Sequence, residues 1–344
     1  MSIQDSSGFE ASRVVAISTE SRNLDSSTAR GLISSAAARL PAISPRLFFK
    51  KIDSTLRGHA GVEVAAALDA FACDAAIVCP AFPAMNRIVS AGYLRVTGSD
   101  FAPIDVAAHF RAQGIEECAF ARCEEAAGAI FSGARVVVLD AVCDDDLDRI
   151  AAAGTATGLR ILWAGSAGLA AALARTLQPG PQRRLIPVAT GPVLFCLGST
   201  HPVTVTQEIA LVNRIHAPVV QAEGTTREAV DGDLCQGRHV VLRIPRGAVG
   251  EERLKELLPR ERISAVAVSG GDTATLFCLA AGVRHIELVD EVLPGIPHGI
   301  IRGGAFDGIP IVTKSGGFGD PDALIQVAEH FSCPNQPAIR RPSH

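Results

Sequence analysis

The sequence predicts a two-domain α/β protein, in which each domain is a mostly parallel sheet flanked by helices. Short apolar strand patterns alternate with helix patterns along the chain, an alternation typical of parallel sheets. The length of 344 residues is enough for about two domains. A segment over 178–192, rich in Pro, Gly and Arg, separates two runs of this alternation. We therefore predict a first domain over 1–177, a linker over 178–192, a second domain over 193–332 and a loose tail over 333–344.

The composition excludes several classes of protein. Hydrophobic residues make up 48% of the chain and charged residues 20%, which is typical of a globular protein. The net charge of −4 argues against a nucleic-acid partner held by bulk charge. Nine Cys without a CxxC pair indicate reduced thiols and favour neither a disulfide framework nor a zinc site. With no signal peptide in the first twelve residues and no apolar run of membrane length, we expect a cytoplasmic protein without membrane contact.

The first domain is expected to begin with two strand–helix units. Val14 to Ile17 predict a short strand, and the Ala-rich segment 26–40 predicts a helix that Pro41 stops. Phe48 and Phe49 lead into a strand that we extend through Asp53. Ser54 or Thr55 is expected to cap the next helix, whose inward residues are Val62, Val64, Ala65 and Leu68.

Four further strands complete the predicted first domain, over 75–79, 93–96, 136–139 and 160–163. The acidic run 144–148 predicts a helix N-terminus, because acidic side chains favour the positive end of the helix dipole. The segment 165–173 predicts a helix capped by Ser166, a geometry that can also hold an anion on backbone N–H groups.

The predicted second domain contains three glycine-bearing loops, each directly after a strand. The strands are predicted over 193–197, 265–268 and 309–313, with a further strand over 240–242. Glycine-rich turns that open helices surround phosphates with backbone donors, and Asp272 or Thr273 is expected to cap the helix of the second loop. No loop matches the GxxxxGK[ST] or GxGxxG pattern, so neither a P-loop nor a Rossmann dinucleotide site is supported. Three such loops in one domain, one beginning with Lys314, favour a nucleotide site.

The segment KKIDSTLRGH, residues 50–59, is the strongest candidate site of the first domain. Its charged groups follow a strand, and the carboxyl ends of strands are where open α/β sheets bind ligands. The mixed charge suits a small anionic, hydroxylated ligand, although an ordinary turn with a solvated ion pair is the alternative. Two more polar loops, 19–22 and 80–87, are also ligand candidates or plain loops. Together with the glycine-bearing loops, such a site fits phosphoryl transfer.

Seven sequence blocks occur in order between Thr19 and about Leu324: KKIDSTLRG, PAFP, GSAGLA, GST..VT..Q, SGGDTA, EVLPGIP and VTKSGGFGD. In these blocks the sequence resembles the four-carbon acid sugar kinase family, whose members include D-threonate, D-erythronate and 3-oxo-tetronate kinases. The resemblance implies an ATP-dependent kinase that phosphorylates a small sugar acid. It further implies that the first domain binds the acid and that the second binds the nucleotide.

The charged and glycine-bearing segments, taken together with the resemblance, indicate particular site residues. Arg57 and Lys51 would pair with the substrate carboxylate, and Asp53 would orient or deprotonate the attacking hydroxyl. Further substrate contacts are expected from Lys50, Ser54, Thr55, Arg22 and Arg87. The nucleotide contacts would come from Ser199, Gly270, Gly271, Asp272, Thr273, Lys314, Gly316 and Gly317. ATP and Mg²⁺ are the implied cofactors; the metal ligands stay unassigned, and a homodimer is an open option.

One departure from the family pattern bears on activity. The family opens with an acidic ADD(L/F)TGA-like turn, and the residues before Val14 hold no such turn, so we expect an N-terminal truncation relative to the family. A truncated, catalytically weak or inactive sugar-acid- and nucleotide-binding relic is therefore one alternative. An NAD(P)-dependent dehydrogenase is a second, and the lack of GxGxxG counts against it.

Overall fold

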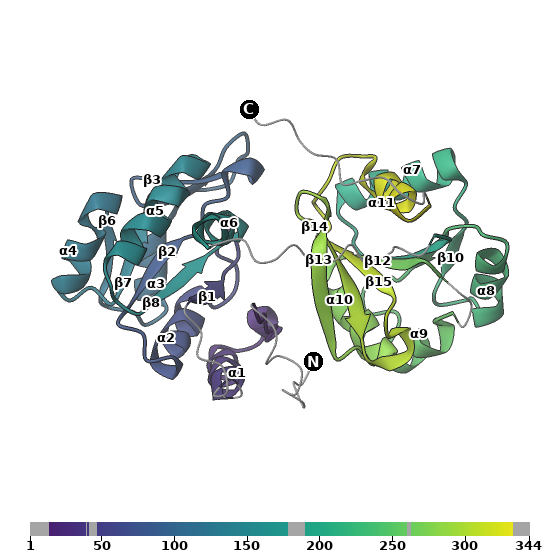
Figure 1. Ribbon diagram of the computed structural model, residues 1–344, viewed down its shortest axis with the longest axis horizontal. Helices are drawn as coiled ribbons and strands as arrows, with labels where there is room; N and C mark the ends of the chain where they lie inside the picture. Colours follow the sequence, from purple (N-terminus) through teal and green to yellow (C-terminus); the bar gives the residue numbers. More distant parts are fainter. Residues whose placement is uncertain (1–13, 39, 41–46, 178–189, 260–262, 333–344) are drawn as a thin grey trace. The chain divides into compact units, whose positions relative to one another are not determined.

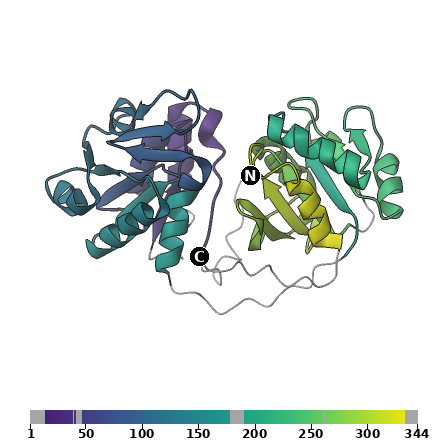
Figure 2. The same ribbon diagram turned by 90° about the horizontal axis from the view of Figure 1, so that it is seen from above.

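The computed structural model describes residues 14–38, 40, 47–177, 190–259 and 263–332. It confirms the α/β class, with helices flanking the strands of the two main sheets (Figure 1 and Figure 2). The chain divides into two compact units between residues 181 and 182, and each is described by itself. The predicted tail and residues 178–189 of the predicted linker lie outside the described residues. Within the described ranges, no helix combines the length and apolar character needed to cross a membrane.

The first unit is built on a five-stranded parallel sheet in the order β1-β8-β2-β7-β6. Its strands are β1 (Phe48–Lys51), β2 (Ala75–Cys79), β6 (Cys118–Ala121), β7 (Val136–Leu139) and β8 (Ile161–Gly165). A small antiparallel sheet joins β3 (Arg87–Ser90), β4 (Tyr93–Val96) and β5 (Ile104–Asp105). The strands β2, β7 and β8 are buried along their whole length, as expected for a parallel sheet covered on both faces.

In the described residues, six α-helices pack around this sheet in two groups. Helix α2 contacts both α1 and α3, and helix α5 contacts both α4 and α6. Their bounds are α1 (Ser26–Ala38), α2 (Ala60–Ala70), α3 (Val106–Ala112), α4 (Ala126–Phe131), α5 (Asp144–Ala156) and α6 (Ala167–Thr176). The predicted cap of α6 is confirmed, because Ser166 Oγ accepts a hydrogen bond from Gly168 N at 3.3 Å. The acidic run at 144–148 begins α5, as predicted.

Two predictions about strands in the first unit are wrong. Val14 to Ile17 form no strand, and Val14 is 78% exposed. Branched side chains favour an extended chain, but a strand also needs a neighbouring strand, and among the described residues β1 pairs only with β8. Strand β1 itself ends at Lys51 and does not reach Asp53, because the Asp53 carbonyl accepts Leu56 N–H in a turn at 3.0 Å.

The predicted cap of α2 is also wrong. The helix begins at Ala60, with His59 at its N-cap position and no side-chain cap. Thr55 is not available as a cap, because its N–H and hydroxyl both donate to the Asp53 carboxylate. Ser54 lies in the same turn. Local side-chain bonding within the turn therefore takes precedence over helix initiation.

The second unit is built on a seven-stranded sheet in the order β10-β11-β9-β12-β15-β14-β13. The first five strands are parallel: β9 (Val193–Leu197), β10 (Val219–Gln221), β11 (Val240–Arg243), β12 (Ala265–Ser269) and β15 (Pro310–Lys314). A hairpin of β13 (His285–Leu293) and β14 (Ile296–Arg302) adds two antiparallel strands. The second sheet is thus mixed, with a parallel centre.

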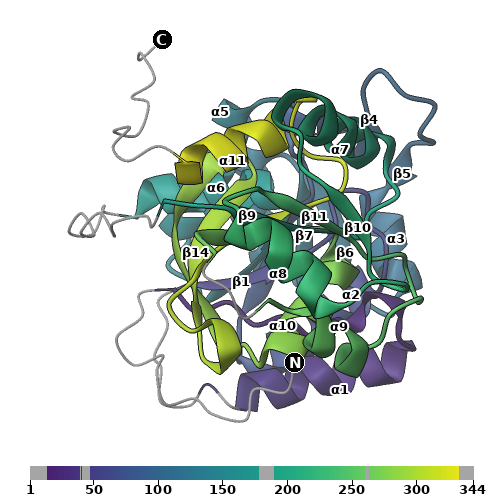
Figure 3. The same cartoon turned by 90° about the vertical axis from the view of Figure 1, so that its right-hand side faces the viewer.

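In the described part of this unit, five α-helices cover the sheet through two separate hydrophobic clusters. One cluster includes residues of α8 (Arg227–Cys235), α9 (Glu251–Leu257) and α10 (Gly271–Ala281). The other includes residues of α7 (Pro202–Ile215) and α11 (Ala323–Ser332). Figure 3 shows α8, α9 and α10 below α7 and α11 in this unit. The predicted cap of α10 is wrong: Gly270 occupies the N-cap position, and Asp272 and Thr273 lie in the first turn.

Close packing of α5 on the first sheet gives a testable prediction. A Cβ atom at Gly154 would lie 2.6 Å from Ile77 Cδ1 and also overlap the Trp163 ring, so we expect Gly154→Ala to destabilise the protein by about 1–3 kcal/mol. Gly128→Ala in α4 is the matched control, because a Cβ there meets nothing within 4 Å. This control should stabilise the protein by about 0.5–1 kcal/mol. Urea denaturation measures both, and a stabilised Gly154→Ala variant would contradict the packing.

Candidate active site

The carboxylate of Asp53 is the centre of a polar cluster directly after β1. Its Oδ1 accepts hydrogen bonds from Thr55 N at 2.8 Å, Thr55 Oγ1 at 2.6 Å and Arg57 Nε at 3.3 Å. Its Oδ2 accepts from Arg57 Nη2 at 2.8 Å. The turn that makes these contacts contains Leu56, a buried residue in the left-handed region at φ 58°. Burial of Leu56 thus holds a strained backbone in which Asp53 and Arg57 meet.

Arg22 joins this cluster from a distant part of the sequence. It lies in the short 3₁₀ helix η1 (Ser21–Asn23), and its Nη2 is 3.4 Å from Asp53 Oδ2. Gly58, at φ 86°, lies against Arg22, and a Cβ at Gly58 would be 3.2 Å from Arg22 Cγ. The Arg22 and Arg57 side chains are 57% and 67% exposed, whereas that of Asp53 is 9% exposed. A buried carboxylate therefore holds two guanidinium groups that are open to solvent.

Burial alone would raise the pKa of Asp53, but hydrogen bonds from Arg57 and Thr55 outweigh it and hold the pKa well below its usual value. The carboxylate is therefore ionised at neutral pH, and its two oxygens carry four hydrogen bonds. A carboxylate in this state is a poor proton acceptor. Its contacts suit the task of holding the two arginines in place.

The two adjacent lysines have different environments. Lys50 Nζ lies 2.7 Å from Glu63 Oε2 and donates to the Lys51 carbonyl at 2.9 Å. Ser21 Oγ donates to the other oxygen of Glu63 at 2.5 Å. Lys51 Nζ donates to the Ile52 carbonyl at 2.7 Å, and burial lowers its pKa. The carboxylate of Glu63 neutralises Lys50. Among the described residues, the charge of Asp53 is then the one negative charge beside three cations, Arg22, Arg57 and Lys51, so the cluster has a surplus of positive charge.

The sequence analysis did not identify Glu63 as part of the site. It predicted Arg87 as a substrate contact, but the structure, over the residues that it describes, does not bring Arg87 into contact with the Asp53 cluster. Glu63 is buried on the apolar face of α2, and a lone acid on such a face was the available signal. Arg87 begins β3 and donates from its guanidinium to the Met85 carbonyl. Within the described ranges, no contact joins Arg87 to the Asp53 cluster, and its Nε is buried without a hydrogen-bond partner.

The three glycine-bearing loops of the second unit leave one edge of its sheet together. The strands that precede them, β9, β12 and β15, are parallel neighbours. Ser269 is in register with both Leu197 and Lys314, so the loops begin at the same level. Gly198 N donates to the Ser269 carbonyl at 3.3 Å, and Gly270 N donates to the Lys314 carbonyl at 2.9 Å. The sheet thus brings the predicted loops into contact.

Glycine is required at several of these positions because the loops pack against one another. A Cβ at Gly316 would overlap Ser199 Oγ, and one at Gly198 would overlap Thr273 Oγ1. Gly270 has a φ of 110°, which side chains rarely adopt. Gly271 differs, because a Cβ there would meet nothing within 4 Å. The fold therefore gives no steric reason for glycine at this first position of α10.

Lys314 lies beneath the third loop and is only 4% exposed. Its Nζ donates to the carbonyls of Ser315, Gly316 and Phe318 at 2.9, 3.2 and 3.2 Å. A fourth contact joins it to Thr204 Oγ1 at 3.3 Å. Burial lowers the pKa of Lys314 to about 8. The ammonium group is thus bound inside the protein, below the loop that it was predicted to open.

Several neighbours of these loops were not singled out from the sequence. Gln207 Nε2 donates to the carbonyls of Phe318 and Asp320 at 3.0 and 2.7 Å. Thr204 Oγ1 donates to the Gly316 carbonyl at 2.8 Å. Both residues belong to the GST..VT..Q block, which was the available signal. At the start of α10 the exposed side chain of Asp272 pairs with Arg246 at 3.1 Å.

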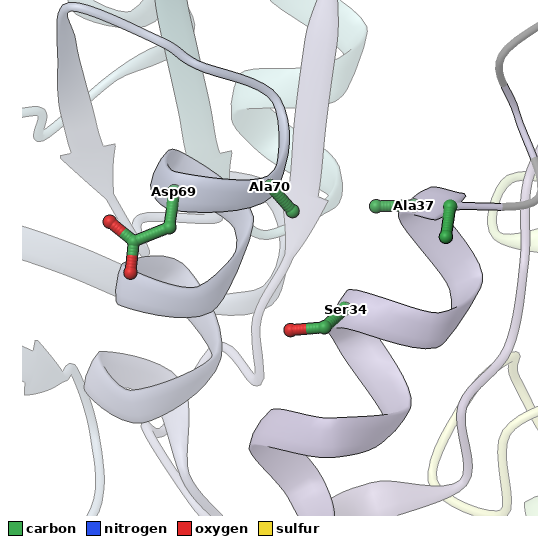
Figure 4. A pocket seen from close by; sticks show the side chains of 5 residues that line it. Ser34, Ala37, Asp69 and Ala70 are labelled. Carbon is green, nitrogen blue, oxygen red and sulfur yellow. The ribbon is translucent and has the colours of Figure 1, made fainter.

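A shallow pocket of about 380 Å³ lies elsewhere in the first unit, between α1 and α2. Ser34 and Ala37 line it from α1, and Asp69 and Ala70 from α2 (Figure 4). The Asp69 carboxylate points away from Ala37 and pairs with Arg30 and Arg135. Its lining offers little chemistry, so it is not the candidate site. In the described parts of the chain, no group of three or more His, Cys, Asp or Glu could hold a metal ion, and the eight cysteines there are free thiols.

Two family models match this chain. Residues 2–109 and 104–173 match a family model described as a sugar-binding N-terminal domain. Residues 218–324 match a family model described as a nucleotide-binding C-terminal domain. The first range contains the Asp53 cluster, and the second contains the loops that follow β12 and β15.

Curated relatives and a solved structure extend the likeness over most of the chain. A D-threonate kinase of Bordetella bronchiseptica is 34% identical, with 92% of this chain and 85% of the relative covered. A D-erythronate kinase of Heliobacterium modesticaldum is 28% identical, with coverage of 92% and 87%. A crystal structure from Salmonella typhimurium LT2 shares 20% identity over 91% of this chain and 88% of that chain, with a TM-score of 0.73. That structure shows a common fold.

Proposed function

Because the chain belongs to the four-carbon acid sugar kinase family, we propose that it is an ATP-dependent kinase. It transfers the γ-phosphoryl group of ATP to a hydroxyl of a small sugar acid such as threonate, erythronate or 3-oxo-tetronate. The observation that carries the proposal is the meeting of three glycine-bearing loops at the ends of β9, β12 and β15. Loops of this kind present backbone N–H groups to phosphate oxygens without interference from side chains.

The nucleotide site would be formed by the loops at Ser199, at 270–273 and at 316–317. Helix α10 starts at Gly271, so its first N–H groups and its dipole favour an anion there. Mg²⁺ is held in kinases by substrate phosphates with one or two carboxylates, so a cage made only of protein groups is not required. Asp272, exposed in the first turn of α10, is the carboxylate that would hold it. The ion would neutralise charge on the β- and γ-phosphates.

The acid site would be the cluster around Asp53. Arg22, Arg57 and Lys51 supply positive charge for the substrate carboxylate. Arg57 already uses Nε and Nη2 on Asp53, so it would offer its remaining N–H groups to the substrate. The low pKa of Asp53 favours the orienting role over the role of general base. Transfer forms a bond between the acid's hydroxyl oxygen and the γ-phosphorus, breaks the bond to ADP and releases the hydroxyl proton.

An ADP-formation assay with Mg²⁺-ATP and a panel of D-threonate, D-erythronate and 3-oxo-tetronate tests the proposal. We expect acid-dependent formation of ADP with at least one acid. ATP binding without turnover on any acid would favour the inactive relic, and turnover of NAD or NADP with an acid would favour a dehydrogenase. Either result would overturn the proposed kinase activity.

Arg57→Lys separates the acid site from the nucleotide site. Lysine keeps the charge but loses the planar fork that bridges both oxygens of Asp53, so we expect the KM for the acid to rise about tenfold. The dissociation constant for ATP should stay unchanged. Arg149→Lys is the matched control, because Arg149 is equally exposed and pairs with Asp146 three residues away. Equal losses of acid and ATP binding in Arg57→Lys would contradict a separate acid site.

A further inference from the structure

The loop over 315–319 is wrapped around the buried ammonium group of Lys314. Three of its carbonyl oxygens, from Ser315, Gly316 and Phe318, point to Nζ at 2.9 to 3.2 Å. Carbonyl oxygens that converge on one point repel one another, because they carry partial charges of the same sign. A positive charge at the centre offsets that repulsion.

The orientation of these carbonyls fixes the orientation of the adjacent N–H groups. In a trans peptide the C=O of one residue and the N–H of the next point in opposite directions. Carbonyls directed inward at Ser315, Gly316 and Phe318 therefore turn the N–H groups of Gly316, Gly317 and Gly319 away from Nζ. Within the described ranges, no hydrogen-bond partner is found for any of these three N–H groups. Gly316 and Gly317 are partly buried and Gly319 is exposed, so this part of the loop is accessible to a ligand.

We propose that Lys314 is a positioning residue that holds the loop 315–319 with three N–H groups directed at an oligophosphate chain. The chemical class of the ligand rests on the proposed function, whereas the orientation of the loop does not. Lys314 does not itself touch the phosphates. Its three protons are shared among four oxygens inside the protein, which leaves none for a ligand.

The electrostatics of Lys314 support this role. Burial lowers its pKa to about 8, and no carboxylate pairs with it in the part of the chain that the structure describes. The charged and titratable groups on the surrounding elements include His201 before α7, Glu208 and Arg214 on α7, His298 and Arg302 on β14, Asp272 on α10 and Asp320 after the loop. Glu208 pairs with Arg243, Arg214 with Asp322 and Arg302 with Glu287. A buried cation without a counter-ion is costly, and a bound anion reduces that cost. Binding should therefore raise the pKa of Lys314.

Calorimetry with tripolyphosphate and with ATP at pH 7 provides the first test. Lys314→Met keeps the apolar stem but loses the cation, and we expect it to bind both ligands at least tenfold more weakly than the wild type. Lys255→Met, at an exposed lysine of α9, should bind both as the wild type does. Unchanged tripolyphosphate affinity in Lys314→Met would overturn the inference.

Proton uptake by the wild type provides a second test that needs no variant. Burial lowers the pKa of Lys314 to about 8, so part of the ammonium loses its proton in the free protein at about pH 8.5, whereas the phosphates of ATP stay ionised. ATP binding at this pH, measured in two buffers of different ionisation enthalpy, should take up a fraction of a proton, and the affinity for ATP should fall as the pH is raised further. A lysine that only supported the fold would leave both quantities unchanged. Binding without proton uptake would overturn the inference, even if Lys314→Met failed to fold.

The two proposals fail separately. Wild type that binds tripolyphosphate through Lys314 but neither binds nor turns over ATP would support the inference and overturn the kinase. Wild type that turns over ATP while Lys314→Met binds both ligands normally would support the kinase and overturn the inference. A wild type that binds neither ligand would overturn both.

Discussion

Gly271→Val is expected to weaken ATP binding at least tenfold, or by about 1.4 kcal/mol, without lowering the melting temperature. A Cβ at this position meets nothing within 4 Å, so the fold itself tolerates a side chain there. A ligand phosphate approaching the first N–H groups of α10 would not tolerate it. Gly316→Val is less informative, because its Cβ overlaps Ser199 Oγ and would distort the loop directly.

Calorimetry with Mg²⁺-ATP and a thermal melt of the free protein measure this effect. Gly232→Val in α8 is the matched control, since a Cβ at Gly232 also meets nothing within 4 Å. The control should melt at or above the wild-type temperature and bind ATP normally. A folded Gly271→Val variant with wild-type ATP affinity would exclude the start of α10 from the phosphate site.

Asp53→Asn is expected to lower kcat/KM for the sugar acid about 100-fold or more. The Asp53 carboxylate accepts two hydrogen bonds from Arg57 and lies 3.4 Å from Arg22. The amide of the substituted residue has only one acceptor oxygen, and its NH₂ group would face the two guanidinium groups. A charge-assisted hydrogen bond is worth about 1.5–3 kcal/mol, so loss of these contacts misplaces both guanidinium groups. ATP affinity should change less than about twofold, because the glycine-bearing loops belong to the other unit.

Asp69→Asn is the matched control for this substitution. Asp69 is a carboxylate of the same unit that also holds two arginines, Arg30 and Arg135, but lies beside the shallow pocket. Steady-state kinetics with the acid varied at saturating ATP should show a loss in Asp53→Asn alone. Equal losses in the two variants would indicate a general effect on stability and remove Asp53 from the acid site.

The ionisation of Asp53 also predicts how acid acts on the fold. Because its pKa is held below the usual value, the ionised form stabilises the fold above about pH 4, and this contribution is lost as pH falls further. The melting temperature should therefore differ less between pH 7 and pH 3 in Asp53→Asn than in the wild type. An unchanged difference would contradict the contacts made by this carboxylate.

The sequence predicted the bounds of strands correctly where a short apolar run has polar or turn-forming residues on both sides. The strands at 75–79, 136–139 and 193–197 have the predicted bounds, because buried parallel strands need continuous apolar residues. The strand at 93–96 also has the predicted bounds, although it is antiparallel and partly exposed. Strands β3, β5, β6, β10 and β14 were not predicted. Of these, β6 and β10 are short segments with exposed residues, which lack this signal. Val14 to Ile17 carry the signal without forming a strand, which shows that pairing decides the outcome.

The candidate site was predictable in composition but not in arrangement. The sequence identified the charged turn after β1 and the three glycine-bearing loops. It could not reveal that Arg22 joins Asp53 or that Glu63 neutralises Lys50, because these contacts connect residues far apart in the chain. The order β9-β12-β15, which brings the loops together, is set by tertiary packing. The inward direction of Lys314 depends on the same packing.

The most direct test of the central claim is ³¹P NMR of the purified chain with Mg²⁺-ATP and D-threonate, with D-erythronate and 3-oxo-tetronate in parallel. If the protein transfers phosphoryl groups to a sugar acid, a new phosphomonoester resonance should grow one-for-one with ADP and only when an acceptor acid is present. Formation of ADP with inorganic phosphate alone, or no conversion of ATP with any of the three acids, would contradict it.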